Sequence, residues 1–214
     1  MPADAKICGV TRERDAALAA GAGAWRIGVI FAGGPRLVSE SLARRIVAAA
    51  DPVPVIGVFG SQDITSILRS AASSNLAGVQ LHGRYDATSA ARLRSEGLEV
   101  WQVARFNDRK SMSNEFDRIG VTADAILVEP LTAGGGGQGV AMPHSLAREA
   151  RELVAGVPFV LAGGLTAENV GSAIRDVGPD AVDVSSGIES APGIKDAERL
   201  SAFLEAVRAA RTSA

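Results

Sequence analysis

Phe159-Val-Leu-Ala-Gly-Gly-Leu-Thr-Ala-Glu-Asn169, followed by Ala181-Val-Asp-Val-Ser-Ser-Gly-Ile-Glu189, is the stretch that decides the fold. It contains two short apolar runs with the lengths and β-branched residues of buried strands. The segment that opens at Thr166 between them is predicted to begin a helix. A strand, a helix and a second strand in this order form the repeating unit of a parallel α/β fold.

The ends of these two strands predict a phosphate site. Gly163 and Gly164 carry no Cβ, so a ligand oxygen can approach their N–H groups. Ser185 and Ser186 add hydroxyl donors beside Gly187. Such amides bind an anion without a basic side chain, and in an eight-stranded barrel the site follows strands seven and eight. The alternative is two ordinary strand-to-helix turns, in which glycine is common.

Length and charge limit the possible partners. The 214 residues suffice for one well-buried core, and we expect a single domain over residues 1–214. A net charge of -2, a pI of about 5.8 and the absence of Lys or Arg runs argue against binding to nucleic acid or to an anionic membrane. The expected partner is therefore a small phosphorylated molecule, bound by a monomer or a homodimer.

The N-terminal sequence and the cysteine count bear on the compartment. The N-terminus lacks the apolar segment of a signal peptide, and no apolar run is long enough to span a membrane. Cys8 is the only cysteine, which excludes an internal disulfide and a zinc site built from cysteines. We therefore expect a cytoplasmic protein that needs no metal and no other cofactor.

Strand-like and helix-like segments alternate along the whole chain. The expected strands are residues 6–10, 26–31, 53–59, 77–82, 99–104, 125–128, 159–162 and 181–184. Helices are expected between them, the first capped by Thr11, whereas residues 107–114 are polar and only weakly helical. Eight alternations favour a single-domain (β/α)₈ TIM barrel, although the pattern alone does not exclude a doubly wound sheet.

In such a barrel the carboxyl ends of all strands meet at one mouth. This topology brings together Cys8, Arg36, Gln80, His82, Glu129, Asp183 and Ser185. A thiol on the first strand and a carboxyl on the sixth, beside a phosphate site, suit proton transfer at two positions of a sugar phosphate. From the residues alone, Cys8 could equally be a small buried hydrophobic residue.

Six motifs together point to one family. They are Lys6-Ile-Cys-Gly-Val-Thr11, residues 31–36 with their Pro-Arg ending, Val55-Ile-Gly-Val-Phe59, Val79-Gln-Leu-His-Gly83, Leu161-Ala-Gly-Gly-Leu165 with Glu168-Asn-Val170, and Asp183-Val-Ser-Ser-Gly-Ile-Glu189 continuing into Pro192-Gly-Ile-Lys-Asp196. In these motifs the chain resembles phosphoribosylanthranilate isomerase of tryptophan biosynthesis over essentially its whole length. Any one motif would indicate only a phosphate-binding barrel.

The resemblance implies an Amadori rearrangement of N-(5-phosphoribosyl)anthranilate. In that family a carboxylic acid protonates the ring oxygen, and a cysteine thiolate removes the C2 proton of the resulting Schiff base. Cys8 matches the base, Arg36 the group that takes the anthranilate carboxylate, and Asp183 a ribose contact. Arg36 could instead be a solvated loop residue, and Asp183 could cap a turn. Gln80 and His82 are expected either to touch the substrate or to be satisfied polar groups at a strand end.

The chain departs from the family pattern at several places, among them Trp25-Arg26, which replaces the usual acidic residue before the second strand. Glu129 stands where the family has an aspartate as general acid, and the extra methylene moves the carboxyl by roughly 1.5 Å, where about 1 Å can cost 10²-fold in rate. Met142-Pro-His144 replaces a Phe-Asp-Trp motif, and Gly33-Gly34 precede Pro35 where a serine is usual. Glycines 134–137 predict a flexible loop that either closes over the substrate or has no role.

These departures leave two other functions open. One is a degenerate barrel that binds a phosphorylated metabolite without turning it over. The other is a related sugar-phosphate isomerase with an altered substrate range.

Overall fold

Eight parallel strands close into a barrel in the order β1 to β8. The computed structural model describes residues 3–120, 122–132 and 139–212, and the structural statements below concern these residues. The strands are β1 (Asp4–Ile7), β2 (Arg26–Ile30), β3 (Val55–Phe59), β4 (Gly78–Leu81), β5 (Glu99–Phe106), β6 (Ala125–Pro130), β7 (Phe159–Ala162) and β8 (Ala181–Val184). The barrel closes where β1 pairs with β8, with Lys6 opposite Asp183. The predicted single-domain (β/α)₈ barrel is confirmed, and the doubly wound sheet is excluded.

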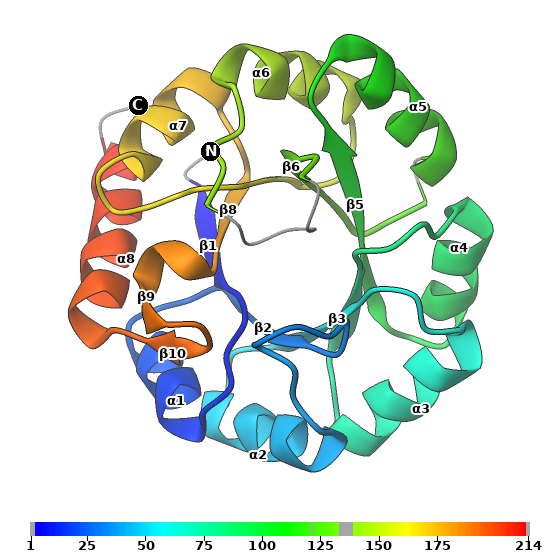
Figure 1. Cartoon of the computed structure of the whole chain (residues 1–214), viewed down its shortest axis with the longest axis vertical. Helices are drawn as coiled ribbons and strands as arrows, with labels where there is room; N and C mark the ends of the chain where they lie inside the picture. Colours follow the sequence, from blue (N-terminus) through cyan, green and yellow to red (C-terminus); the bar gives the residue numbers. More distant parts are fainter. Residues whose placement is uncertain (1–2, 121, 133–138, 213–214) are drawn as a thin grey trace.

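Helices surround the barrel as an outer ring (Figure 1). They are α1 (Glu13–Gly21), α2 (Glu40–Ala50), α3 (Ile64–Ser74), α4 (Ala87–Ser95), α5 (Arg109–Ile119), α6 (His144–Leu153), α7 (Val170–Val177) and α8 (Ala197–Thr212). Between β8 and α8 the chain adds a 3₁₀ turn, η1 (Ser186–Ile188), and a small antiparallel pair, β9 (Glu189–Ala191) and β10 (Ile194–Lys195).

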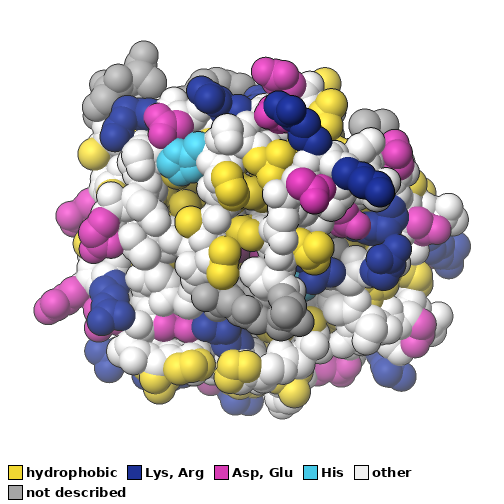
Figure 2. Space-filling view, turned by 45° about the horizontal axis from the view of Figure 1, so that its top comes forward, with side chains coloured by type: hydrophobic (Ala, Val, Ile, Leu, Met, Phe, Trp, Pro, Cys, Tyr) yellow, Lys and Arg dark blue, Asp and Glu magenta, His cyan; other side chains and the backbone are white. Residues whose placement is uncertain are grey.

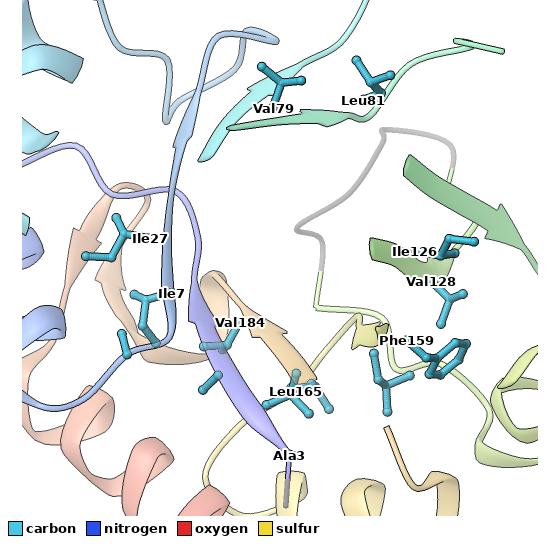
Figure 3. Close-up of a cluster of buried hydrophobic side chains, with 14 of the residues drawn as sticks. Ala3, Ile7, Ile27, Val79, Leu81, Ile126, Val128, Phe159, Leu165 and Val184 are labelled. Atoms are coloured by element: carbon cyan, nitrogen blue, oxygen red, sulfur yellow. The ribbon is translucent and has the colours of Figure 1, made fainter. Parts of the chain in front are cut away.

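The core has two layers because successive side chains of a strand point to opposite faces. The outer layer fills the space between strands and helices, and Figure 3 shows part of it, contributed by residues of β1, β2, β4, β6, β7 and β8. The inner layer fills the barrel and includes Trp101, Val103, Leu127 and Val160. Trp101 is fully buried, and its ring centroid lies 5.5 Å from that of Trp25. The barrel is therefore packed below its mouth.

Two boundaries differ from the sequence prediction in a way that affects the site. The prediction that residues 107–114 are at best weakly helical was wrong, because α5 begins at Arg109. The Asp108 side chain accepts a hydrogen bond from the Ser111 amide, and the Ser111 hydroxyl oxygen accepts one from the Asp108 backbone amide, so a capping box starts the helix. Strand β5 also runs to Phe106 rather than to Ala104, so Arg105 lies within the strand.

The expected cap of the first helix was also wrong. The N-cap residue of α1 is Arg12, whose guanidinium pairs with Asp15, while the Thr11 hydroxyl donates to the Gly193 carbonyl. Thr11 therefore ties β1 to the segment before β10 rather than opening α1.

The surface carries no dominant charge on the face shown in Figure 2, where basic and acidic side chains are intermixed. Within the described residues, no helix combines the length and apolar character needed to cross a membrane.

Candidate active site

A cavity of about 480 Å³ lies at the carboxyl ends of the strands. All seven side chains that topology was expected to bring together line it: Cys8, Arg36, Gln80, His82, Glu129, Asp183 and Ser185. Arg105, at the end of β5, lines it as well. Glu129 and Arg105 reach the cavity because they continue the inward-facing rows of Leu127 on β6 and Val103 on β5.

A buried cation lies beneath the cavity floor. The Lys6 side chain is fully buried, and its Nζ donates to Asp183 Oδ1 at 2.7 Å and to Gln80 Oε1 at 2.9 Å. Burial disfavours the ammonium ion, but Asp183 and the Cys8 sulfur outweigh that effect, so the pKa of Lys6 is raised. Lys6 therefore stays charged, and Gln80 supports it while lining the cavity.

Cys8 lies at the end of β1 with 5% of its surface exposed. Gly28 on β2 leaves the space it needs, because a Cβ there would lie 2.8 Å from Cys8 Sγ and 3.1 Å from Lys6 Nζ. Burial raises the pKa of the Cys8 thiol, and the Lys6 ammonium only partly offsets this. The sulfur is therefore a thiol at neutral pH.

The carboxyl of Glu129, on β6, can lose its proton near neutral pH, unlike the Cys8 thiol. Its side chain is buried, and burial raises its pKa to about 7, while Arg105 and Lys6 lower it and Asp183 raises it further. A carboxyl with such a pKa holds a proton that it can give up near neutrality, as a general acid requires.

His82 lies beside this carboxyl, with Nε2 3.3 Å from Glu129 Oε1. Burial lowers the His82 pKa to about 4, helped by Arg105 and Lys6, so the imidazole is neutral near pH 7. The contact is therefore not an ion pair at that pH. A neutral imidazole next to a protonated carboxyl leaves the proton available for transfer.

Arg36 reaches the cavity over Gly9, where a Cβ would lie 2.6 Å from Arg36 Cδ. Its Nε and Nη2 donate to the two carboxylate oxygens of Glu189 at 2.9 and 2.7 Å, and Glu189 also accepts from Lys195 Nζ at 2.8 Å. Arg36 is thus a fixed group rather than a solvated loop residue. Its Nη1 makes no hydrogen bond to the described residues and can still bind an anion.

Only one of the five residues predicted to bind phosphate lines the cavity. Ser185 lines it, and its buried Oγ has no hydrogen-bond partner within the described residues. Gly163, Gly164, Ser186 and Gly187 lie at the ends of β7 and β8 but do not line this cavity. The two turns touch each other, because a Cβ on Gly187 would overlap the Leu165 carbonyl oxygen.

The segment after β6 covers part of this region. A Cβ on Gly164 would lie 2.7 Å from the Gly139 carbonyl oxygen and 2.8 Å from the Ala141 amide. The glycines 134–137 proposed as a lid lie outside the described residues. Met142 is buried, and His144 begins α6 with its Nδ1 2.8 Å from Asp176 on α7, so neither lines the cavity.

Three residues of the site were not predicted from the sequence: Lys6, Glu189 and Arg105. The signal for Lys6 was a charged side chain in an otherwise apolar strand, which requires a buried partner. The signal for Arg105 was lost because the expected strand ended at residue 104, two residues before β5 ends at Phe106. In the part of the chain that is described, no three His, Cys, Asp or Glu side chains are grouped as a metal site would need.

The eight-stranded barrel has the architecture of (β/α)₈-barrel enzymes, and its mouth holds a thiol and a carboxyl with a near-neutral pKa, which are groups suited to proton transfer. Comparison with known proteins defines the family. The family model "N-(5'phosphoribosyl)anthranilate (PRA) isomerase" matches residues 5–206. The chain therefore belongs to the phosphoribosylanthranilate isomerase family, isomerases of tryptophan biosynthesis.

Individual relatives agree with this assignment. The N-(5'-phosphoribosyl)anthranilate isomerase of Desulfovibrio desulfuricans is 40% identical over 203 residues, which are 93% of this chain and 92% of that protein. The crystal structure of the Thermotoga maritima enzyme matches with a TM-score of 0.88 at 32% identity, covering 97% of this chain and 99% of that one. A structure of such an isomerase with reduced 1-(o-carboxyphenylamino)-1-deoxyribulose 5-phosphate matches with a TM-score of 0.85 at 30% identity, with the same coverage.

Proposed function

We propose that this chain converts N-(5-phosphoribosyl)anthranilate into 1-(2-carboxyphenylamino)-1-deoxyribulose 5-phosphate, with Glu129 as general acid and Cys8 as general base. Family membership supports the reaction. The observation that carries the residue roles is that both side chains line one cavity, Glu129 on β6 and Cys8 directly after β1, with only β7 and β8 between these strands in the barrel. Acid and base thus stand on either side of the strands that end in the predicted phosphate turns.

Glu129 performs the first proton transfer in this scheme. Its carboxyl donates a proton to the furanose ring oxygen, the C1–O bond breaks, and its electron pair stays on the oxygen that becomes the C4 hydroxyl. The nitrogen lone pair forms the C1=N bond of a cationic Schiff base. Because the Glu129 pKa is about 7, a large share of the molecules carry the required proton at neutral pH.

Cys8 performs the second transfer. Its thiolate removes the C2 proton, the C–H electrons form the C1=C2 bond, and the Schiff-base electrons return to nitrogen as an enolamine. The C2 hydroxyl then loses its proton and C1 gains one, which gives the ketone. The net change is an isomerisation. Formation of the Schiff-base cation close to Cys8 favours the thiolate that burial alone disfavours.

Charged and polar groups around the cavity hold the substrate. The free Nη1 of Arg36 suits the anthranilate carboxylate, since Glu189 already fixes the guanidinium plane. The unpartnered Ser185 hydroxyl suits a phosphate oxygen, together with the turn amides at Gly163, Gly164, Ser186 and Gly187. Asp183, held by Lys6, is placed for a ribose hydroxyl.

Two properties of the working protein belong to the same proposal. We infer a cytoplasmic enzyme, and either a monomer or a homodimer. Light scattering on the purified chain decides the second point, and a mass of four chains or more would contradict it.

Turnover of N-(5-phosphoribosyl)anthranilate by the purified chain tests the function. We expect product formation that falls about 10²- to 10⁴-fold in Cys8→Ala, because a positioned general base contributes this much. The same variant should not restore growth of a tryptophan auxotroph that lacks the isomerase, whereas the parent chain should. Substrate-induced thermal stabilisation without any product from the parent chain would contradict the proposal and indicate a binding protein instead.

A further inference from the structure

Arg105 is the cation of the cavity that has no assigned role. It lies on β5 directly opposite Glu129 on β6 in the strand register, so both side chains leave the barrel wall toward the same cavity. The other cavity arginine, Arg36, donates two hydrogen bonds to Glu189. Lys6 is held by Asp183 and Gln80. The Arg105 guanidinium, by contrast, makes no hydrogen bond or ion pair with the described residues.

The proposed reaction creates a charge next to this guanidinium. When Glu129 gives up its proton it becomes a carboxylate, and a buried carboxylate is costly unless a cation faces it. The neighbouring His82 is neutral near pH 7 and cannot supply that charge. Cys8 and Asp183, which also line the cavity, cannot supply a positive charge either.

We propose that Arg105 is a positioning residue for the general acid: its guanidinium stabilises the Glu129 carboxylate formed in the first proton transfer. This inference rests on the proposed function for its catalytic meaning, but its electrostatic content does not depend on turnover. The arrangement also suits the longer acid of this chain, because a Glu carboxyl reaches further along the cavity than an Asp carboxyl, and the adjacent strand carries a cation that lines the same cavity.

Several charged and titratable groups surround Arg105 and Glu129. Those facing Glu129 are Arg105 from β5, His82 from the end of β4, Lys6 and Cys8 from β1, and Asp183 from β8. On the helix side, Glu115 of α5 accepts a hydrogen bond from the Arg105 backbone amide, and its carboxylate pairs with Arg118 at 2.7 Å. Burial raises the pKa of Glu115, but Arg118 and, less strongly, the Arg105 charge lower it. The ion pair of this carboxylate is with Arg118, while the Arg105 side chain lines the cavity.

The variants Arg105→Met and Arg105→Lys test the proposal, with Arg109→Met as the control. Arg109 lies just after β5, is exposed and pairs with Glu149, so its replacement removes the same charge away from the cavity. In Arg105→Met we expect kcat to fall about 10- to 100-fold with KM changed less than threefold, and the near-neutral step of the pH–rate profile to move up by about one pH unit. Arg105→Lys should restore most of that step, and Arg109→Met should leave it in place.

A second measurement needs no activity. The Glu129 pKa is read from the carboxyl ¹³C chemical shift of the labelled protein, compared with Glu129→Gln to assign the signal. We expect this pKa to rise in Arg105→Met and to stay unchanged in Arg109→Met. If it rises in a protein that does not turn over the substrate, the proposed function fails while this inference stands. An unchanged pKa, or a KM that rises tenfold or more with kcat intact, would overturn the inference and make Arg105 a substrate-binding group.

Discussion

The replacement Glu129→Gln should make the protein more stable at alkaline pH and at the same time nearly inactive. The amide has the shape of the carboxyl but cannot ionise. Glu129 Oε1 has no hydrogen-bond partner within the described residues, so the substitution breaks no such bond. What it removes is the free energy of ionising a buried carboxyl and the proton that the reaction needs.

The magnitude follows from the pKa. Burial raises the pKa of Glu129 from an ordinary 4.5 to about 7, which corresponds to about 3 kcal/mol. Since the folded-state pKa is the higher one, this contribution to stability is fully present below pH 4.5 and is lost as the pH rises through about 7. Between pH 5 and pH 8 the stability difference should therefore move by about 2.5 kcal/mol in favour of Glu129→Gln.

The assay is urea unfolding of both proteins at several pH values and constant ionic strength, followed by tryptophan fluorescence. At pH 7 the kcat/KM of the variant should be lower by about 10²- to 10⁴-fold, or about 3 to 5 kcal/mol in activation free energy. Stability curves that run parallel for the two proteins from pH 5 to pH 8 would refute the buried, near-neutral carboxyl. Undiminished turnover would refute its role as the acid.

Three further predictions concern the same cavity. The reaction needs protonated Glu129 and ionised Cys8, and the Cys8 pKa lies above the Glu129 pKa. We therefore expect kcat/KM to rise with pH up to about 7, to stay level between the two pKa values and to fall above the Cys8 pKa. A profile that rises once and shows no alkaline fall would contradict this. Burial lowers the His82 pKa to about 4, so protonation of His82 should lower the free energy of unfolding by about 3 kcal/mol as the pH falls from 6.5 through 4. In urea unfolding, His82→Gln should not show this decrease. Gly28→Ala should place a methyl against the sulfur and lower kcat about 100-fold, whereas Gly21→Ala, with open space around its Cα, should be neutral in the same assay.

Several parts of the site could be predicted from the chain alone. Cys8, Glu129 and Asp183 each follow an apolar run, and the carboxyl ends of parallel strands share one edge, so their meeting in a cavity follows from topology. The phosphate turns were recognised because glycine and serine stand at the ends of two consecutive strands. Whether these turns bind phosphate stays a prediction, since only Ser185 lines the described cavity.

Other parts depended on local boundaries that composition does not reveal. The polar segment after β5 has few apolar residues, so it gave only a weak helical signal, yet the capping box at Asp108 and Ser111 starts α5 there. Ending β5 at Ala104 left Arg105 in a supposed loop. In a strand of period two, that residue continues the inward row of Trp101 and Val103, which brings it to the acid.

The sequence by itself determined the alternation of eight strands and helices, the family and the identity of the thiol and the carboxyl, because these are carried by local pattern and by motifs. Only the tertiary structure decided that the Glu129 carboxyl has a pKa of about 7, that Lys6 is buried against Asp183, and that the Arg105 guanidinium lines the cavity of the acid without an ion pair to any described residue. The physical reason is that desolvation and charge pairing are summed over groups from β1, β4, β5 and β8, which are far apart along the chain and meet only when the barrel closes.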